Sequence, residues 1–107
     1  MINWDRVLVL RSEIGPDDFE EVVSLFLEEA DEAMARLSVA GGAKALAADL
    51  HFVKGAALNL GFDTLAALCQ EVEKRAGDLS VDLEAVRNAY ATCRSEFEEG
   101  AKRAFAA

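Results

Sequence analysis

The segment LHFVKGAALNLG at residues 50–61 contains the one histidine of the chain, His51, inside an apolar pattern of helical spacing. Apolar residues at intervals of three and four residues form one stripe: Leu46, Leu50, Val53, Ala57 and Leu60. Such spacing places side chains on one face of an α-helix, and His51 lies outside that face. We therefore predict a helix over residues 43–60 that presents the imidazole to solvent.

The neighbours of His51 on the predicted helix surface are small or flexible: Ala47, Lys54, Gly55 and Leu58 all fall within about 60° of it. Gly55 costs a helix interior about 1 kcal/mol relative to alanine, which suggests that the space beside the ring is needed. Lys54 lies three residues on, where its ammonium can reach an anion held on the imidazole. This arrangement suits a phosphoryl group, although a single histidine in a helix is more often an ordinary surface or core residue.

The run His51-x-x-Lys54-Gly55, with Gly61 as a predicted left-handed end of the helix and Cys69 and Glu73 in the helix that follows, resembles the histidine-containing phosphotransfer (HPt) domains of multistep His–Asp phosphorelays. The resemblance extends over nearly the whole chain. At position 56, where many members carry a small hydroxyl residue, this chain has alanine. The resemblance implies that His51 is the phosphoacceptor. It also implies that a receiver domain supplies the phosphoaspartate and a Mg²⁺ ion, and that transfer between the aspartate and His51 is reversible.

Two side chains are candidates to assist His51. We expect Lys54 to neutralise the phosphoryl oxygens, because positioning and charge neutralisation dominate phosphoryl transfer. The resemblance suggests that Glu73 approaches the other ring nitrogen of His51 and fixes its tautomer. The alternative for Glu73 is a surface carboxylate paired with Lys74 or with solvent.

The predicted surface around His51 is a candidate receiver-binding surface, formed by Ala47, Phe52, Gly55 and Leu58. Phe52 is on the side of the helix away from the apolar stripe, where it could anchor a helix of the receiver. Singly exposed aromatic residues are also common without any binding role.

Composition excludes several classes of protein. The chain has 107 residues, 52% of them apolar, and we expect one domain over residues 1–107. No apolar stretch is long enough to cross a membrane and no leader peptide is apparent, so we expect a cytoplasmic protein. The net charge of −9 argues against nucleic acid and membrane partners, and the acidic runs are most simply solvated helix faces.

The chain is expected to bind no cofactor or metal of its own. Cys69 and Cys93 fall at apolar positions of two different helices, so we predict buried, reduced thiols and no disulfide. One histidine and two cysteines do not complete a zinc site without suitably spaced carboxylates.

The periodicity predicts an all-α fold, an up-down antiparallel four-helix bundle with a short extra N-terminal helix. The expected helices cover residues 4–12, 16–40, 43–60, 63–76 and 82–103, with a turn at residues 78–81. Asn3 is the expected N-cap of the first helix, whose inward residues are predicted to be Trp4, Val7, Leu8 and Leu10. We expect a monomer.

The sequence leaves two other functions open. The chain could be a helical interaction module that binds a response regulator or another helical partner without carrying phosphate. It could also be a small hydrolase with His51 as the base, but no serine or threonine lies within one helical turn of His51. If His51 is phosphorylated, the protein is a phosphocarrier rather than a turnover enzyme, and no kinase activity is expected.

Overall fold

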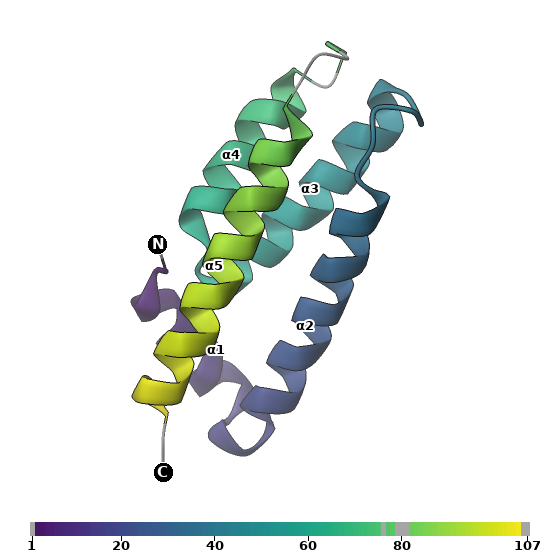
Figure 1. Cartoon of the computed structure of the whole chain (residues 1–107). Helices are drawn as coiled ribbons and strands as arrows, with labels where there is room; N and C mark the ends of the chain where they lie inside the picture. Colours follow the sequence, from purple (N-terminus) through teal and green to yellow (C-terminus); the bar gives the residue numbers. More distant parts are fainter. Residues whose placement is uncertain (1, 76, 79–81, 106–107) are drawn as a thin grey trace.

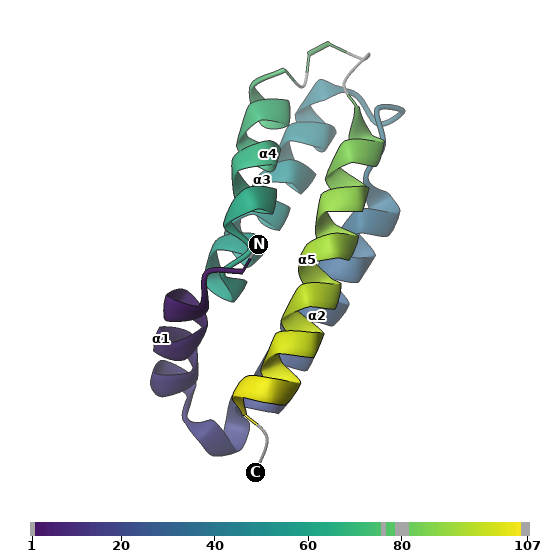
Figure 2. The same ribbon diagram turned by 60° about the vertical axis from the view of Figure 1, so that its left-hand side comes forward.

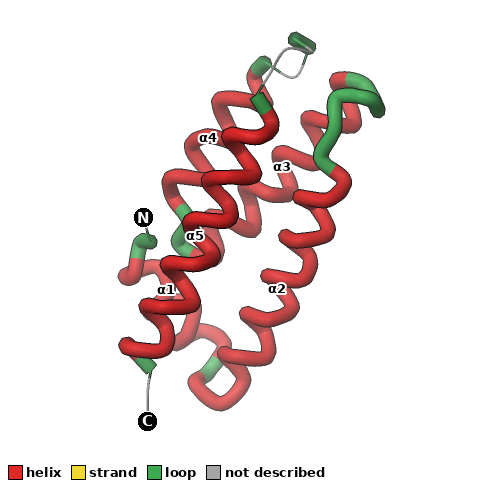
Figure 3. The backbone as a smooth tube through the Cα atoms, in the orientation of Figure 1, coloured by secondary structure: helices red, strands yellow, loops and turns green. Residues whose placement is uncertain are grey.

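The computed structural model describes residues 2–75, 77–78 and 82–105, and over these residues it contains five α-helices and no strand (Figures 1 and 3). The helices are α1 (Trp4–Ile14), α2 (Pro16–Arg36), α3 (Ala43–Leu60), α4 (Asp63–Lys74) and α5 (Leu83–Ala104). The all-helical prediction is therefore confirmed for the described residues.

The helix ends follow from local chemistry. The side chain of Asn3 accepts a hydrogen bond from the Arg6 N–H at 3.2 Å and caps α1, as predicted. Asp82 caps α5 in the same way through the Ala85 N–H at 3.1 Å. Pro16 occupies the first turn of α2, where its missing N–H costs no helical hydrogen bond.

Gly61 ends α3 in the left-handed conformation with φ of +76°, which confirms the predicted C-cap. The carbonyl of Gly61 accepts a hydrogen bond from the Asn3 N–H at 2.7 Å. A Cβ atom on Gly61 would lie 2.5 Å from the Asn3 carbonyl oxygen. Glycine is therefore required here both for the backbone conformation and for the close approach of the segment that leads into α1.

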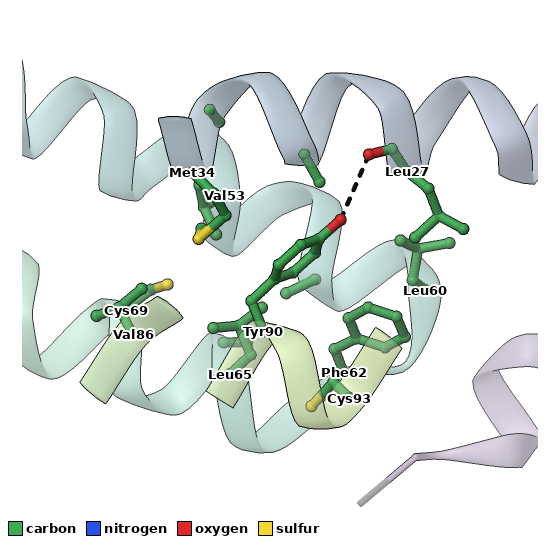
Figure 4. Close-up of a cluster of buried hydrophobic side chains, with 14 of the residues drawn as sticks. Leu27, Met34, Val53, Leu60, Phe62, Leu65, Cys69, Val86, Tyr90 and Cys93 are labelled. Carbon is green, nitrogen blue, oxygen red and sulfur yellow. Dashed lines mark hydrogen bonds between the residues drawn. The ribbon is translucent and has the colours of Figure 1, made fainter. Parts of the chain in front are cut away.

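The hydrophobic core runs along the length of the molecule, which measures 47 × 20 × 19 Å. Figures 1 and 2 show α2, α3, α4 and α5 lying lengthwise beside one another, with the short α1 near the end where α2 begins. The contact between α3 and α4 is the most extensive between any two helices. The whole predicted stripe of α3 is buried, and so are five residues at helical spacing on α5: Leu83, Val86, Tyr90, Cys93 and Phe97. Figure 4 shows how side chains from α2 to α5 meet around Tyr90.

The first helix attaches to the rest through aromatic packing as well as through Asn3. The Trp4 ring stacks on Phe97 of α5 with ring centroids 5.9 Å apart. A Cβ atom on Gly100 would come within 2.1 Å of the Trp4 ring, so the absence of a side chain at Gly100 makes room for the indole.

Some sequence-based boundaries and one core assignment are wrong. The first helix continues to Ile14, whereas α2 ends at Arg36, before the Gly41-Gly42 pair. Leu8 was expected to point inward but is 52% exposed, because Val7 and Leu10 already fill the face of α1 that meets α2 and α3. The fourth helix ends at Lys74, earlier than predicted. Residue 76, where the fourth helix was expected to end, and most of the predicted turn, residues 79–81, lie outside the described residues.

Candidate functional site

His51 lies in the middle of α3 with its side chain 71% exposed. Its neighbours along the helix, Leu50 and Val53, are buried to 1% exposure or less and hold α3 against the core. The helix is therefore fixed in place while the imidazole extends into solvent, as the sequence pattern predicted.

Glu73 of α4 approaches the imidazole from the side. Its Oε2 atom lies 3.6 Å from Nδ1 of His51, within ion-pair range but longer than a normal hydrogen bond. The other carboxylate oxygen, Oε1, is buried and has no hydrogen-bond partner. Among the described residues Glu73 makes no ion pair with Lys74. The carboxylate is thus directed at Nδ1, which leaves Nε2 as the ring nitrogen open to an incoming group.

Lys54 is half-buried one turn after His51, and no carboxylate of the described part of the chain lies within ion-pair distance of it. Lys54 and Glu73 both act on Cys69, which is fully buried in α4. Burial, and then the negative charge of Glu73, raise the pKa of the Cys69 thiol to about 11, while the positive charge of Lys54 opposes this rise. Both charged groups are therefore close enough to Cys69 to influence its thiol, which stays protonated at neutral pH.

The surface next to His51 is open. A Cβ atom built on Gly55 would have no neighbour within 4 Å. Phe52 and Leu58 are 42% and 48% exposed, and Ala47 is half-buried against the core. The exposure predicted for Phe52 and Leu58 is confirmed, whereas Ala47 is only half-exposed; the part of these residues in binding a receiver stays a prediction.

Neither thiol is exposed at this site. Cys69 and Cys93 are both free and buried, as predicted. Within residues 2–75, 77–78 and 82–105, no group of three or more histidine, cysteine, aspartate or glutamate side chains is arranged to hold a metal ion.

One polar cluster, formed by Asp31, Tyr90 and Arg94, was not predicted from the sequence. Asp31 of α2 accepts hydrogen bonds from Tyr90 Oη, at 2.5 Å, and from the Arg94 guanidinium, both of α5. Burial and the hydrogen bond to Asp31 raise the pKa of Tyr90. Asp31 and Arg94 are 63 residues apart, so no local spacing signals their contact.

Comparison with known families shows which kind of domain carries this site. The family model of the Hpt domain matches residues 21–104, which include α3, α4, α5 and most of α2. This chain belongs to the Hpt domain family. It is therefore a histidine-containing phosphotransfer module of phosphorelays. No curated protein and no solved structure gave a significant match.

The Hpt domain match contains His51, Lys54 and Glu73, while α1 precedes it. His51 is the one imidazole of this Hpt domain. No helix within the described residues has the length and apolar character needed to cross a lipid bilayer.

Proposed function

We propose that this protein is a phosphorelay intermediate in which His51 accepts a phosphoryl group from a receiver-domain aspartate and passes it reversibly to another receiver aspartate. One observation carries the proposal: within an Hpt domain, the one imidazole is exposed, with Nδ1 facing the Glu73 carboxylate. That arrangement favours the tautomer with a proton on Nδ1 and a lone pair on Nε2.

In the proposed step, Nε2 of neutral His51 attacks the phosphorus of the receiver's acyl phosphate. The N–P bond forms as the bond between phosphorus and the aspartate oxygen breaks, and the electron pair of that bond leaves with the aspartate carboxylate. The proton on Nδ1 stays in place, so the phosphorylated ring carries a positive charge that Glu73 stabilises from 3.6 Å. Reversal needs only a second receiver carboxylate in line with the N–P bond.

Lys54 and the receiver's Mg²⁺ share the neutralisation of the phosphoryl oxygens in this proposal. Lys54 has no ion-pair partner in the described part of the chain, so its ammonium can turn toward an oxygen near His51 without breaking a salt bridge. Phe52, Leu58, Gly55 and Ala47 form the proposed receiver-binding surface around the ring.

We also propose that α2 to α5 form an up-down antiparallel four-helix bundle with α1 as an extra helix, acting as a single monomeric domain in the cytoplasm. Short connections between long helices support this arrangement, because they return the chain beside itself.

The test is transfer of labelled phosphate from a phosphorylated receiver to the purified protein. We expect an acid-labile, base-stable phosphoramidate on the wild type and no label on His51→Gln, with helical circular dichroism unchanged. Label that survives His51→Gln, or that is stable in acid and lost in base, would place the phosphate on another side chain. A receiver that binds the wild type but never transfers phosphate would instead show an interaction module.

A further inference from the structure

A groove lies between α2 and α5, away from His51. It has a volume of about 520 Å³, within the range of about 300–1,000 Å³ common for ligand-binding pockets. Buried or half-buried apolar side chains line its inner part: Phe19, Val23, Phe97, Ala101 and Phe105. Exposed polar side chains complete its border: Glu20, Ser24, Glu98 and Lys102.

The groove follows the direction of the two helices. Its lining residues recur at intervals of three and four from Phe19 to Ser24 on α2 and from Phe97 on α5 to Phe105, the C-cap of α5. This spacing covers about one and a half turns of α2 and just over two turns from Phe97 to Phe105. An apolar groove between two parallel walls of this kind accepts the apolar face of an amphipathic helix, whose side chains repeat with the same period.

The negative charge of α2 favours a positively charged partner. This helix carries eight acidic residues and one basic residue, Arg36. Within the described part of the chain, Asp31 is the one carboxylate of these eight that forms an ion pair. Seven carboxylates of α2 are therefore without an ion pair among the described residues. Four of them, Asp17, Asp18, Glu20 and Glu21, lie in its first two turns, and Glu20 lines the groove, which Lys102 also borders. Such a wall attracts a positively charged partner and repels an acidic one.

We propose that the α2–α5 groove is a docking site for a basic amphipathic helix of another protein. The apolar face of that helix packs on Phe105, Ala101 and Val23, and its lysine or arginine side chains reach Glu20 and the neighbouring carboxylates in the first two turns of α2. His51 and Glu73 belong to α3 and α4, whereas the groove is lined by residues of α2 and α5 and by Phe105, which directly follows α5. The docked helix and a receiver can therefore be bound at the same time, so the groove would link the phosphorelay module to a further protein.

A synthetic amphipathic peptide of about 18 residues, with leucine at helix-periodic positions and lysine at the others, is the probe. We expect it to bind the wild-type protein, to gain helical content on binding, and to lose affinity as salt rises from about 0.01 M to about 1 M. The same peptide with glutamate in place of lysine should not bind. An absence of binding by the lysine peptide at low salt would overturn the proposal.

Charge variants separate a defined site from general attraction. Glu20→Lys should weaken binding about fivefold, since it reverses a charge at the border of the groove. Glu29→Lys is the matched control, because it makes the same change on an exposed residue of α2 that does not line the groove. Lys102→Gln should tighten binding slightly, because it removes the one basic side chain at the border. Equal affinities of the Glu20 and Glu29 variants would overturn the proposal.

The apolar part of the groove has its own test. Phe105→Ala should weaken peptide binding about tenfold, as truncation of an aromatic anchor commonly does. Phe52→Ala removes an exposed aromatic ring elsewhere and should leave the affinity for the peptide unchanged. Sedimentation of the protein alone gives the remaining outcome. A dimer that Phe105→Ala dissociates would show that a second copy of this chain, and not a basic helix, occupies the groove.

Discussion

The α3–α4 pair and the α2–α5 pair join neighbouring helices by different means. Between α3 and α4 the contact is extensive and apolar, with Leu50, Val53 and Cys69 almost fully buried. Contacts between α2 and α5 are made by long side chains. Tyr90 and Arg94 donate hydrogen bonds to Asp31, and the Phe19 ring packs edge-to-face on Phe105, which follows α5, with ring centroids 5.4 Å apart. His51, the proposed phosphoacceptor, is thus carried by the closely packed α3–α4 pair, whereas a groove stays open between α2 and α5.

The largest expected effect is at Gly55, on the α3–α4 pair, where the space beside the backbone is open. Gly55→Gln should lower the rate of transfer to His51 by about 100-fold, because the new side chain would hold the receiver about 1 Å or more from in-line geometry. The variant should also be more stable by up to about 1 kcal/mol, since glycine disfavours a helix and no atom lies within 4 Å of the added Cβ.

Single-turnover transfer and thermal unfolding measure both effects. Gly55→Ala is the matched control, because it gives the same backbone gain with little added volume. It should be stabilised and still transfer at close to the wild-type rate. A destabilised Gly55→Gln protein would mean that the position is closely packed, and unchanged transfer would mean that the open space serves no partner.

Substitutions between α2 and α5 should change the stability of the protein but not the rate of phosphoryl transfer to His51. Asp31→Asn should lower the free energy of unfolding by about 1–3 kcal/mol, since it removes the charge that Arg94 and Tyr90 share. Chemical denaturation measures the loss, and transfer to His51 should be unchanged. Glu28→Gln changes an exposed carboxylate of the same helix that forms no ion pair in the described residues, so it should be neutral. Equal stability of the two variants would remove the Asp31 cluster from the account of this pair.

A smaller effect on phosphoryl transfer is expected at Lys54, also on the α3–α4 pair. An interaction of one partly exposed charge is worth about 1 kcal/mol or less, so Lys54→Ala should slow transfer by about fivefold. Its melting temperature should stay close to that of the wild type. Lys44→Ala, at the exposed start of α3, is the control for net charge. Transfer rates that match between these two variants at low salt would exclude a specific role for Lys54.

The smallest expected effect concerns the pH dependence of stability in the α3–α4 pair. The pKa of Cys69 rises from about 9 in the unfolded chain to about 11 in the folded protein. Because the folded state keeps the proton, the stabilisation is complete below about pH 9 and is lost as the pH rises through about 11. Cys69→Ala should flatten the decline in unfolding free energy over this interval. A decline as steep as that of the wild type would assign it to other groups, such as Tyr90.

Periodicity predicted the parts of this structure that depend on local sequence. The boundaries of α3, the Gly61 cap and the buried stripe from Leu46 to Leu60 are confirmed, because helical spacing and glycine chemistry act over a few residues. The predicted ends of α1 and α4 were each wrong by two residues, because the last turn of a helix frays easily and its extent depends on packing.

Contacts between residues far apart in the sequence could not be predicted from local sequence patterns. Nothing near Asp31 in the sequence indicates Arg94 or Tyr90, and nothing near Gly100 indicates that Trp4 needs its space. The 3.6 Å approach of Glu73 to His51 was anticipated through family resemblance, because the spacing of the two residues alone does not define the crossing of α3 and α4. The α2–α5 groove arises from how two helices separate, which no pattern within one helix reveals.

The stacking of Trp4 on Phe97 gives the molecule a built-in optical reporter. Trp4 is the one tryptophan of the chain, and its ring is held between α1 and α5. Its emission therefore follows the attachment of α1 to α5, whereas circular dichroism follows all the helices together. If the two signals change at different denaturant concentrations, α1 detaches before the other helices unfold. If they change together, the first helix and the rest of the chain form one cooperative unit.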